Sequence, residues 1–296
     1  VYLFVTTDVT VKMLPLDNKP EFSVVVDMPE GTALGSTANV TRRIAEELSG
    51  IPEVTAIQTY AGTAKPFDFN GLVRHYYLRQ SPWHGEVQVQ LLDKKERTRK
   101  SHEIAVEARE RLATIRAESG ASLTIVEMPP GPPVLQAVVA EIYGPDAETR
   151  RQVTEEMTEI FNSVDGLADV DNFLTAEWSS WRFVVDTDKV MRLGISPATV
   201  VDTLDMAMGG YKLGDIKRGQ FLEPTFIVLQ VPLAVRAQIG RLGELPVPTA
   251  SGDTVPLAEL GRFTLTPEDE TIFHKDLRPV QFVVGDAVGR LGAPIY

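Results

Sequence analysis

The spacing of apolar residues predicts four strands and two helices between residues 21 and 128. The strand-like stretches are EFSVVVDMPEG, EVTAIQTYAG, GEVQVQLLD and ASLTIVEM, each followed by turn or loop residues. Helical spacing appears in STANVTRRIAEELSG and SHEIAVEARERLATIRAESG. The stripes expected to face a core are Val40, Ile44 and Leu48 in the first helix, and Ile104, Ala108, Leu112 and Ile115 in the second. The resulting order, β-α-β-β-α-β, is that of a ferredoxin-like unit.

Capping residues mark the ends of both helices. Ser36 or Thr37 is the expected N-cap of the first helix, and Ser101 that of the second. Gly50 and Gly120 are expected to end them, because glycine adopts the left-handed conformation of many helix ends at little cost.

The pattern restarts after residue 134. LQAVVAEIYGPD has the residue types of a strand, AETRRQVTEEMTEIFNSVDG those of a helix, and LADVDNFLTAE those of a further strand. The helical residues expected to point inward are Val153, Met157, Ile160 and Phe161. A duplicated βαβ module is the simplest interpretation.

An insert from Trp181 to Glu270 interrupts the second copy. It contains a strand, a helical pair and several short strands and turns, which predicts a small mixed α/β subdomain. RPVQFVVGDAVG then resumes the second copy near Gln281, and the pattern still requires a helix and a strand after it. We therefore expect the sequence to be part of a longer protein. The predicted fold class is α+β, with two tandem ferredoxin-like βαββαβ subdomains, the second interrupted by the mixed α/β insert.

Four prolines stand between the two copies, at Pro129, Pro130, Pro132 and Pro133. Proline fixes φ and lacks a backbone N–H, so these residues cannot continue a sheet ladder. The stretch is expected to be a stiff connector that keeps two subdomains apart, with a simple linker as the alternative.

The net charge, the absence of cysteine and the short apolar runs exclude several classes of protein. A net charge of -12 and a pI of about 4.9 argue against a surface for nucleic acid or anionic lipid. The sequence has no cysteine, which excludes disulfides, thiolate zinc sites and cysteine nucleophiles. No apolar run reaches the roughly 18 residues of a membrane span. For the first 20 residues, an edge strand and a membrane-proximal stub are both open.

The sequence contains no arrangement of residues typical of an enzyme active site. The histidines, at positions 75, 84, 102 and 274, lack metal-ligand spacing, and the acidic residues are scattered. GDAVG and AMGGYKLG are not placed as a phosphate-binding loop between a strand and a helix. We predict that the chain is not an enzyme and has no cofactor or resident metal.

Several phrases, in their order and spacing, resemble a transporter family. VKMLPLDNKPEFSVVVDMPEGT, MPPGPPV, DTDKVMRLGISPATVVDTLDMAMGG and HKDLRPVQFVVGDAVG are similar to the second large periplasmic loop of resistance-nodulation-division (RND) efflux permeases of the AcrB/AcrD/AcrF type. The resemblance covers Val11 to Tyr296. It implies an inner-membrane homotrimer of Gram-negative bacteria that uses proton influx to export amphiphilic compounds through an adaptor protein and an outer-membrane channel.

The resemblance also divides the chain. Residues 1–20 would be a membrane-proximal stub and 21–129 the first porter subdomain. Residues 130–180 and 271–296 would belong to the second porter subdomain, and 181–270 would form the docking (funnel) subdomain. In this family substrate enters a cleft between two such porter subdomains, so the proline connector would let that cleft open and close.

The implied substrate contacts lie mainly in TYAGTAKPFDFNGLVRHYYL, where the family has its switch loop, carried over here to Gly62, Pro66 and Gly71. Aromatic side chains on such a loop suit amphiphilic ligands. The candidate contacts are Tyr60, Phe67, Phe69, Tyr76, Val126 and Met128. Alternatively, Phe67 and Phe69 fill the subdomain core, and core packing is the favoured role for Val126. Strand alternation predicts that one of Tyr76 and Tyr77 points inward.

Two other interpretations stay open. Metal-exporting relatives use a set of methionines in this cleft, and Met28 lies at a plausible position for one of them. No methionine falls where the second and third are expected, and thioether ligands hold soft ions only when several converge. The remaining alternative is a stand-alone ligand-binding or scaffold protein made of ferredoxin-like modules.

Overall fold

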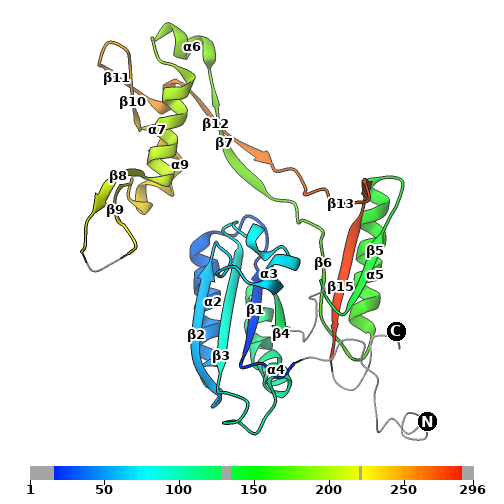
Figure 1. Ribbon diagram of the computed structural model, residues 1–296. Helices are drawn as coiled ribbons and strands as arrows, with labels where there is room; N and C mark the ends of the chain where they lie inside the picture. Colours follow the sequence, from blue (N-terminus) through cyan, green and yellow to red (C-terminus); the bar gives the residue numbers. More distant parts are fainter. Residues whose placement is uncertain (1–16, 128–134, 220–221, 289–296) are drawn as a thin grey trace, which may run out of the picture. The chain divides into compact units, whose positions relative to one another are not determined.

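The computed structural model describes residues 17–127, 135–219 and 222–288, without the side chains of Phe69 and Asn70 (Figure 1). These residues divide into two compact units. Unit 1 holds the described residues before Ser179 and after Glu268, and unit 2 is Ser179–Glu268.

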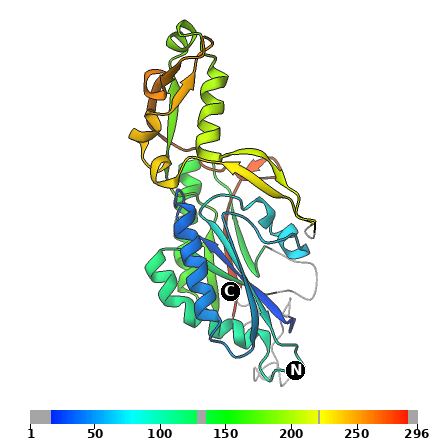
Figure 2. The same cartoon turned by 90° about the vertical axis from the view of Figure 1, so that its left-hand side faces the viewer.

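The first half of unit 1 is a four-stranded antiparallel sheet with two helices. The strands are β1 (Glu21–Asp27), β2 (Val54–Ala61), β3 (His84–Leu91) and β4 (Ser122–Glu127), in the order β2-β3-β1-β4. Helix α2 (Leu34–Leu48) follows β1, and α4 (Ser101–Ser119) follows β3. Both helices lie on one face of the sheet (Figure 2). The order of elements is the predicted one.

The core of this half lies between the sheet and the two helices. Every residue of the two predicted helical stripes is buried there, so these predictions are confirmed. Strand side chains from the same face complete the core, among them Phe22, Val24, Val87, Val89, Leu123 and Ile125. Alternation along the strands therefore leaves the opposite face of the sheet, here called the helix-free face, to the intervening side chains.

The predicted N-caps were wrong for both helices. Helix α2 begins after Ala33, which makes no side-chain cap hydrogen bond, and Ser36 and Thr37 lie inside the helix. Thr37 is fully buried and faces Gly85, where an added Cβ would lie 3.3 Å from the Thr37 methyl carbon. Ser101 is the first residue of α4 rather than its cap, and its amide donates to Asn18 Oδ1 at 2.9 Å. The position of Ser101 thus depends on a tertiary contact.

The second half of unit 1 repeats part of this arrangement. Strands β5 (Val138–Ile142), β6 (Leu167–Asn172) and β15 (Gln281–Ala287) form an antiparallel sheet in the order β5-β15-β6, and α5 (Ala147–Ser163) connects β5 to β6. The order matches β1-β3-β2 of the first sheet, with β15 in the place of β3. This is the duplicated βαβ module that the sequence predicted. A short pair, β13 (His274–Lys275) and β14 (Arg278–Pro279), precedes β15.

Two of the four residues predicted to point inward from α5, Met157 and Phe161, do so, and the other two do not. Thr154 and Phe161 are buried and Met157 packs beside them, whereas Val153 is 38% exposed and Ile160 55% exposed. The helix therefore turns its 154-157-161 stripe to the sheet, with a threonine in it whose hydroxyl donates to Arg150 O at 2.7 Å. That internal hydrogen bond is what allows a polar side chain to occupy a buried position.

Unit 2 is a mixed α/β arrangement, as predicted. Strands β7 (Ser179–Val185) and β12 (Gly261–Pro267) pair with each other, and β10 (Pro246–Pro248) pairs with β11 (Thr254–Pro256). The helices are α6 (Thr187–Arg192), α7 (Pro197–Gly209), α8 (Leu233–Arg236) and α9 (Ile239–Gly243), with a short 3-10 turn η2 (Leu257–Glu259). The core residues of this unit are Val190, Ile195, Val200, Val247, Leu257 and Leu260.

A two-stranded ribbon extends the fold of unit 2. It consists of β8 (Tyr211–Ile216) and β9 (Thr225–Leu229), and all of its strand residues except Thr225 are exposed. Among the residues that the structure describes, no helix combines the length and the apolar character needed to cross a membrane.

The phase of α5 can be tested with two neighbouring substitutions. Phe161→Ala should lower the free energy of unfolding by about 3–5 kcal/mol, because it removes a buried aromatic side chain. Ile160→Ala should cost less than about 1 kcal/mol, because Ile160 is mostly exposed. Urea unfolding of both variants measures the difference. Equal costs would contradict the observed orientation of the helix.

Candidate functional site

The segment between β2 and β3 lies over the helix-free face of the first sheet. It contains α3 (Phe69–Val73) and a 3-10 turn η1 (Tyr76–Leu78), on the side of the sheet away from α2 and α4 (Figure 2). We call residues 62–83 the covering segment. It holds three of the six residues that the sequence predicted to contact substrate, Phe67, Phe69 and Tyr76, and all three predicted switch-loop residues.

A buried ion pair fastens the covering segment to the sheet. Lys65 Nζ lies 3.2 Å from Glu86 Oε1 and 2.8 Å from Asp68 Oδ2, and it donates to Ser23 Oγ at 2.9 Å. The Glu86 side chain is 1% exposed and the Lys65 side chain 8% exposed. Burial alone would lower the pKa of Lys65, but the charges of Glu86 and Asp68 outweigh it and raise that pKa. Lys65 is therefore a fixed cation.

A second attachment holds the other end of the covering segment. Arg79 Nη1 lies 2.6 Å from Asp27 Oδ1, and Arg79 Nη2 donates to the carbonyl oxygen of Val26 at 2.9 Å. His84 is next to this pair. Desolvation, assisted by the charge of Arg79, lowers the pKa of His84 to about 4, so its imidazole is neutral at pH 7.

Between these attachments the segment presents aromatic side chains to the outside. Phe67 is 69% exposed and Tyr77 is 42% exposed, with their ring centroids 6.4 Å apart. His75 stands edge-on to Tyr77 at 6.1 Å. Phe67 thus lies outside the subdomain core, and the two rings form an exposed aromatic pair. Its role in substrate binding remains a prediction.

Tyr76 and Tyr77 do not lie on a strand, so the alternation argument was wrong. They belong to η1, which follows His75 at a φ of +56°. Tyr76 is half-buried, and desolvation raises the pKa of its hydroxyl. The Arg79 guanidinium lies 5.7 Å from the centre of its ring. Tyr76 and Tyr77 therefore differ in exposure because of the 3-10 turn and not because of strand alternation.

A small hollow gathers several of the predicted residues. Pro66, Phe67, Gly71 and Tyr76 line it, together with Ala64, Lys65, Asp68 and Tyr77. Asp68 fixes the turn beneath it by accepting a hydrogen bond from the Gly71 amide at 2.5 Å. Gly62 begins the segment at a φ of +68°, a conformation that favours glycine, and an added Cβ would lie 2.7 Å from Leu34.

Other predicted contacts lie apart from this hollow. Tyr60 is on β2, where its hydroxyl donates to Gln58 Oε1 at 2.8 Å. Val126 is on the helix-free face of β4 and is only 3% exposed, which fits the packing role favoured from the sequence. Met128 lies outside the described residues, as does the side chain of Phe69.

Met28, the methionine considered as a metal ligand, packs into the hydrophobic core and is 7% exposed. Within the described ranges there is also no group of three or more histidine, aspartate or glutamate side chains arranged to hold a metal ion.

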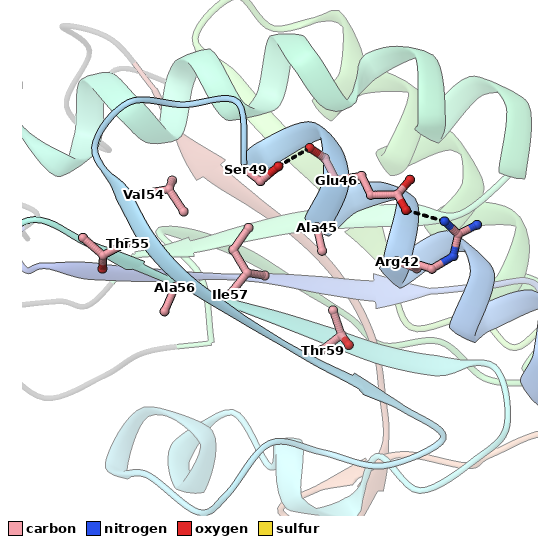
Figure 3. Close-up of a pocket in the computed structure, with 9 residues that line it drawn as sticks. All are labelled: Arg42, Ala45, Glu46, Ser49, Val54, Thr55, Ala56, Ile57 and Thr59. Carbon is pink, nitrogen blue, oxygen red and sulfur yellow. Dashed lines mark hydrogen bonds and ion pairs between the residues drawn. The ribbon is translucent and has the colours of Figure 1, made fainter.

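A second, shallower pocket lies between α2 and the edge strand β2 (Figure 3). Arg42 and Glu46 form an ion pair on its helical side, and Val54, Ile57 and Thr59 line its strand side. None of the predicted contact residues is in it.

The charged residues that organise this half of the chain have little signal in the sequence. Glu86 could have been noticed as an acidic residue within an alternating strand. Asp171 on β6 has no such signal: it accepts a hydrogen bond from Ser122 Oγ at 2.9 Å, across to β4. Desolvation, with a smaller contribution from Asp27, raises the pKa of Asp171 to about 6.

A family model described as the AcrB/AcrD/AcrF family matches residues 1–292. The chain belongs to the AcrB/AcrD/AcrF family. Members of this family are RND permeases of the inner membrane, so the predicted resemblance is confirmed at this level.

Two curated relatives are named for metal resistance and cation efflux. The cobalt-zinc-cadmium resistance protein CzcA of Cupriavidus metallidurans and the cation efflux system protein CzcA of an Alcaligenes species are each 23% identical over 144 residues. These matches cover 47% of this chain but only 13% of each relative's length. Two crystal forms of a heavy metal efflux pump match 97% of this chain and 29% of theirs, at 20% identity, with TM-scores of 0.69 and 0.68. At this identity the likeness establishes the fold.

The Lys65–Glu86 pair leads to a stability prediction. Lys65→Met should destabilise the chain by about 3–5 kcal/mol, because it leaves a buried carboxylate without its cation. The double variant Lys65→Met/Glu86→Gln should recover most of that loss. Lys19→Met, in an exposed pair with Asp17, is the control and should cost less than about 1 kcal/mol. Urea unfolding measures all three, and a Lys65→Met cost as small as the control's would show that Glu86 is not buried as described.

The raised pKa of Asp171 leads to a pH prediction. The folded chain binds this proton more tightly than the unfolded chain, so the penalty for an ionised Asp171 is full above about pH 7 and disappears below its ordinary pKa of 3.8. Asp171→Asn should therefore stabilise the chain by about 1–3 kcal/mol at pH 8. The gain should shrink as the pH falls through 6 and vanish near pH 4. Thermal unfolding of variant and wild type across this range checks it; a gain independent of pH would refute the assignment.

Proposed function

We propose that this chain is the periplasmic porter and docking portion of a proton-driven RND efflux permease in the envelope of a Gram-negative bacterium. The complete protein is then a transporter rather than an enzyme. In this proposal residues 21–129 form the first porter subdomain, 130–180 with 271–296 the second, and 181–270 the docking subdomain. The family match over residues 1–292 is the observation that supports it most directly.

We assign amphiphilic or hydrophobic compounds as the exported substrates. The support is the exposed pair of Phe67 and Tyr77, held on a segment that two ion pairs attach to the sheet. Aromatic faces give large apolar contact without demanding one ligand shape. Because Lys65 and Arg79 are held at fixed points, the segment between them can change conformation while remaining attached to the sheet.

Transition-metal ions are the second candidate substrate. The observation that favours them is the naming of the relatives, which are cation and heavy metal efflux proteins. The burial of Met28 in the core counts against a methionine-based path through this chain.

The proposal includes assembly with other chains: a homotrimer of the complete protein, a periplasmic adaptor and an outer-membrane channel. The β8–β9 ribbon supports such assembly. Tyr211, Leu213, Ile216, Phe226 and Leu229 are each about half exposed there. An isolated two-stranded ribbon with so much exposed apolar surface gains stability when another surface covers it.

The experiment is a susceptibility profile of a strain that lacks the full-length gene. We expect lost resistance to cationic dyes and detergents, and unchanged resistance to cobalt, zinc, cadmium and copper salts. Restoring the gene with Phe67→Ala should leave export of dyes clearly reduced. The same change in the isolated chain should alter its free energy of unfolding by less than about 1 kcal/mol, because the ring is mostly exposed.

Tyr143→Ala is the matched control, since Tyr143 is an aromatic residue of unit 1 that is 38% exposed but lies outside the covering segment. It should restore dye resistance fully. If the deletion strain loses only its metal resistance, transition-metal ions become the favoured substrates and amphiphilic compounds are ruled out. A Phe67→Ala protein that exports dyes at the wild-type rate would remove the aromatic pair from the substrate path.

A further inference from the structure

The short hairpin of β13 and β14 has a turn that does not suit its sequence. Lys275 pairs with Arg278, so that Asp276 and Leu277 alone form the loop. Their φ values are +50° and +63°, and positive φ at both central residues is the mark of a type I′ turn. Such turns favour asparagine followed by glycine, because the left-handed conformation brings a Cβ too close to a carbonyl oxygen. Aspartate tolerates this conformation, but in leucine it is strained.

Leu277 is an exception within this chain. In the part of the chain that the structure describes, every other residue with positive φ is a glycine, an aspartate or a histidine. Leu277 is also 96% exposed, so packing within the chain does not compensate for its strain. A strained conformation that the fold itself does not compensate indicates a role for the side chain outside the fold.

Two contacts at the base of the hairpin hold the turn in place. Lys275 forms an ion pair with Glu141 on β5, and the Arg278 guanidinium lies 4.7 Å from the centre of the Tyr143 ring. The Tyr143 hydroxyl donates to Glu141 Oε2 at 2.9 Å, which links the two contacts. The hairpin is therefore attached to the end of β5 through both of its strands, and Leu277 projects from a supported turn.

The turn combines an apolar side chain with a positive charge. Leu277 is followed by Arg278, and among the described residues no carboxylate lies within ion-pair distance of that guanidinium, whereas Lys275 is paired. The chain as a whole carries a net charge of -12. A second copy of this chain therefore presents a mostly acidic surface, which complements the charge at the turn.

The shape of the turn determines what kind of contact a second copy can make. One projecting leucine needs a socket of a different shape, so the two surfaces in contact are different. Contacts between different surfaces are heterologous, and a closed ring built from them has at least three members. A two-fold dimer would instead place turn against turn, where the two Arg278 side chains repel each other.

We propose that Leu277 and Arg278 insert into an apolar socket with carboxylates at its rim on the neighbouring copy of the full-length protein. The apolar contact in the assembly then compensates for the strain at Leu277, and the rim carboxylates supply the partner of Arg278. This inference rests on the homotrimer of the proposed function, and it adds a surface that joins the members of that trimer.

Leu277→Gly separates the strain from the contact. In dilute solutions of this chain, urea unfolding should show a folding equilibrium constant about two- to fivefold higher, because the relief of strain exceeds the entropy cost of glycine. In the full-length protein the same change should shift dissociation of the trimer to a protein concentration about tenfold higher or more, measured by light scattering. Asp276→Gly is the matched control: it changes the other left-handed residue but keeps the leucine, and it should leave dissociation of the trimer unchanged.

Photo-crosslinking of the purified full-length protein identifies what the turn contacts. An amino acid with a light-activated side chain replaces Leu277, and illumination should give one adduct of twice the monomer mass. The same amino acid in place of Ile160, an aliphatic residue of unit 1 that is 55% exposed, should give no such adduct. Peptide mapping of the adduct should place the second attachment next to acidic residues.

Several results would overturn the proposal. Illumination that yields no adduct, or one within a single copy, would show that the turn does not contact a neighbour. Unchanged stability of Leu277→Gly would show that the leucine is not strained in solution. Equal weakening of the trimer by Asp276→Gly would show that assembly needs the backbone of the turn and not the leucine. A protein that exports dyes without forming the adduct would refute this contact alone, whereas one that forms the adduct but exports nothing would refute the proposed function and support the contact.

Discussion

The Lys65–Glu86 pair is the contact on which the arrangement of the first half of unit 1 depends. Burying a carboxylate to 1% exposure in the middle of a sheet is costly unless a cation lies beside it. The cation, Lys65, comes from the covering segment, so Glu86 is buried beside a cation only when that segment is in place. Because the pair lies on the helix-free face, it leaves the apolar packing of α2 and α4 intact. The sheet thus has one face held by hydrophobic contact and one held by charge.

Two of the buried carboxylates of unit 1, Glu86 and Asp169, serve as attachment points, but they attach different parts of the chain. Glu86 holds a loop to its own sheet through one lysine, and Asp169 holds a neighbouring sheet through two arginines and an amide. Such pairs contribute little net stability compared with apolar packing, but removal of one partner is costly because it leaves the other charge buried and uncompensated. Arginine suits the attachment at Asp169, since its planar fork can bind a carboxylate and a carbonyl oxygen together.

The regular elements of this chain could be predicted from sequence because amphipathic spacing is a local signal. The stripes of α2 and α4 were found in this way, as was the repeated βαβ module. For α5 the sequence predicted Met157 and Phe161 correctly but placed Val153 and Ile160 inward, because the third buried position holds a threonine bonded to the helix backbone. The start of α4 at Ser101 and the contacts of Asp169 depend on partners far away in the sequence. The bulge in β6 also has no signature in LADVDNFL, since it is defined by pairing with a strand more than 100 residues later.

The duplicated module also explains where the distinctive parts of the chain are inserted. In the first copy the covering segment lies between β2 and β3, and in the second copy unit 2 lies between the equivalent strands β6 and β15. These strands are antiparallel neighbours, so the ends that the insertion must join are already close together. Lengthening such a connection costs little, because loop-closure entropy grows only with the logarithm of length. One position in the module can therefore accept a 22-residue segment or a 90-residue subdomain without disturbing either sheet.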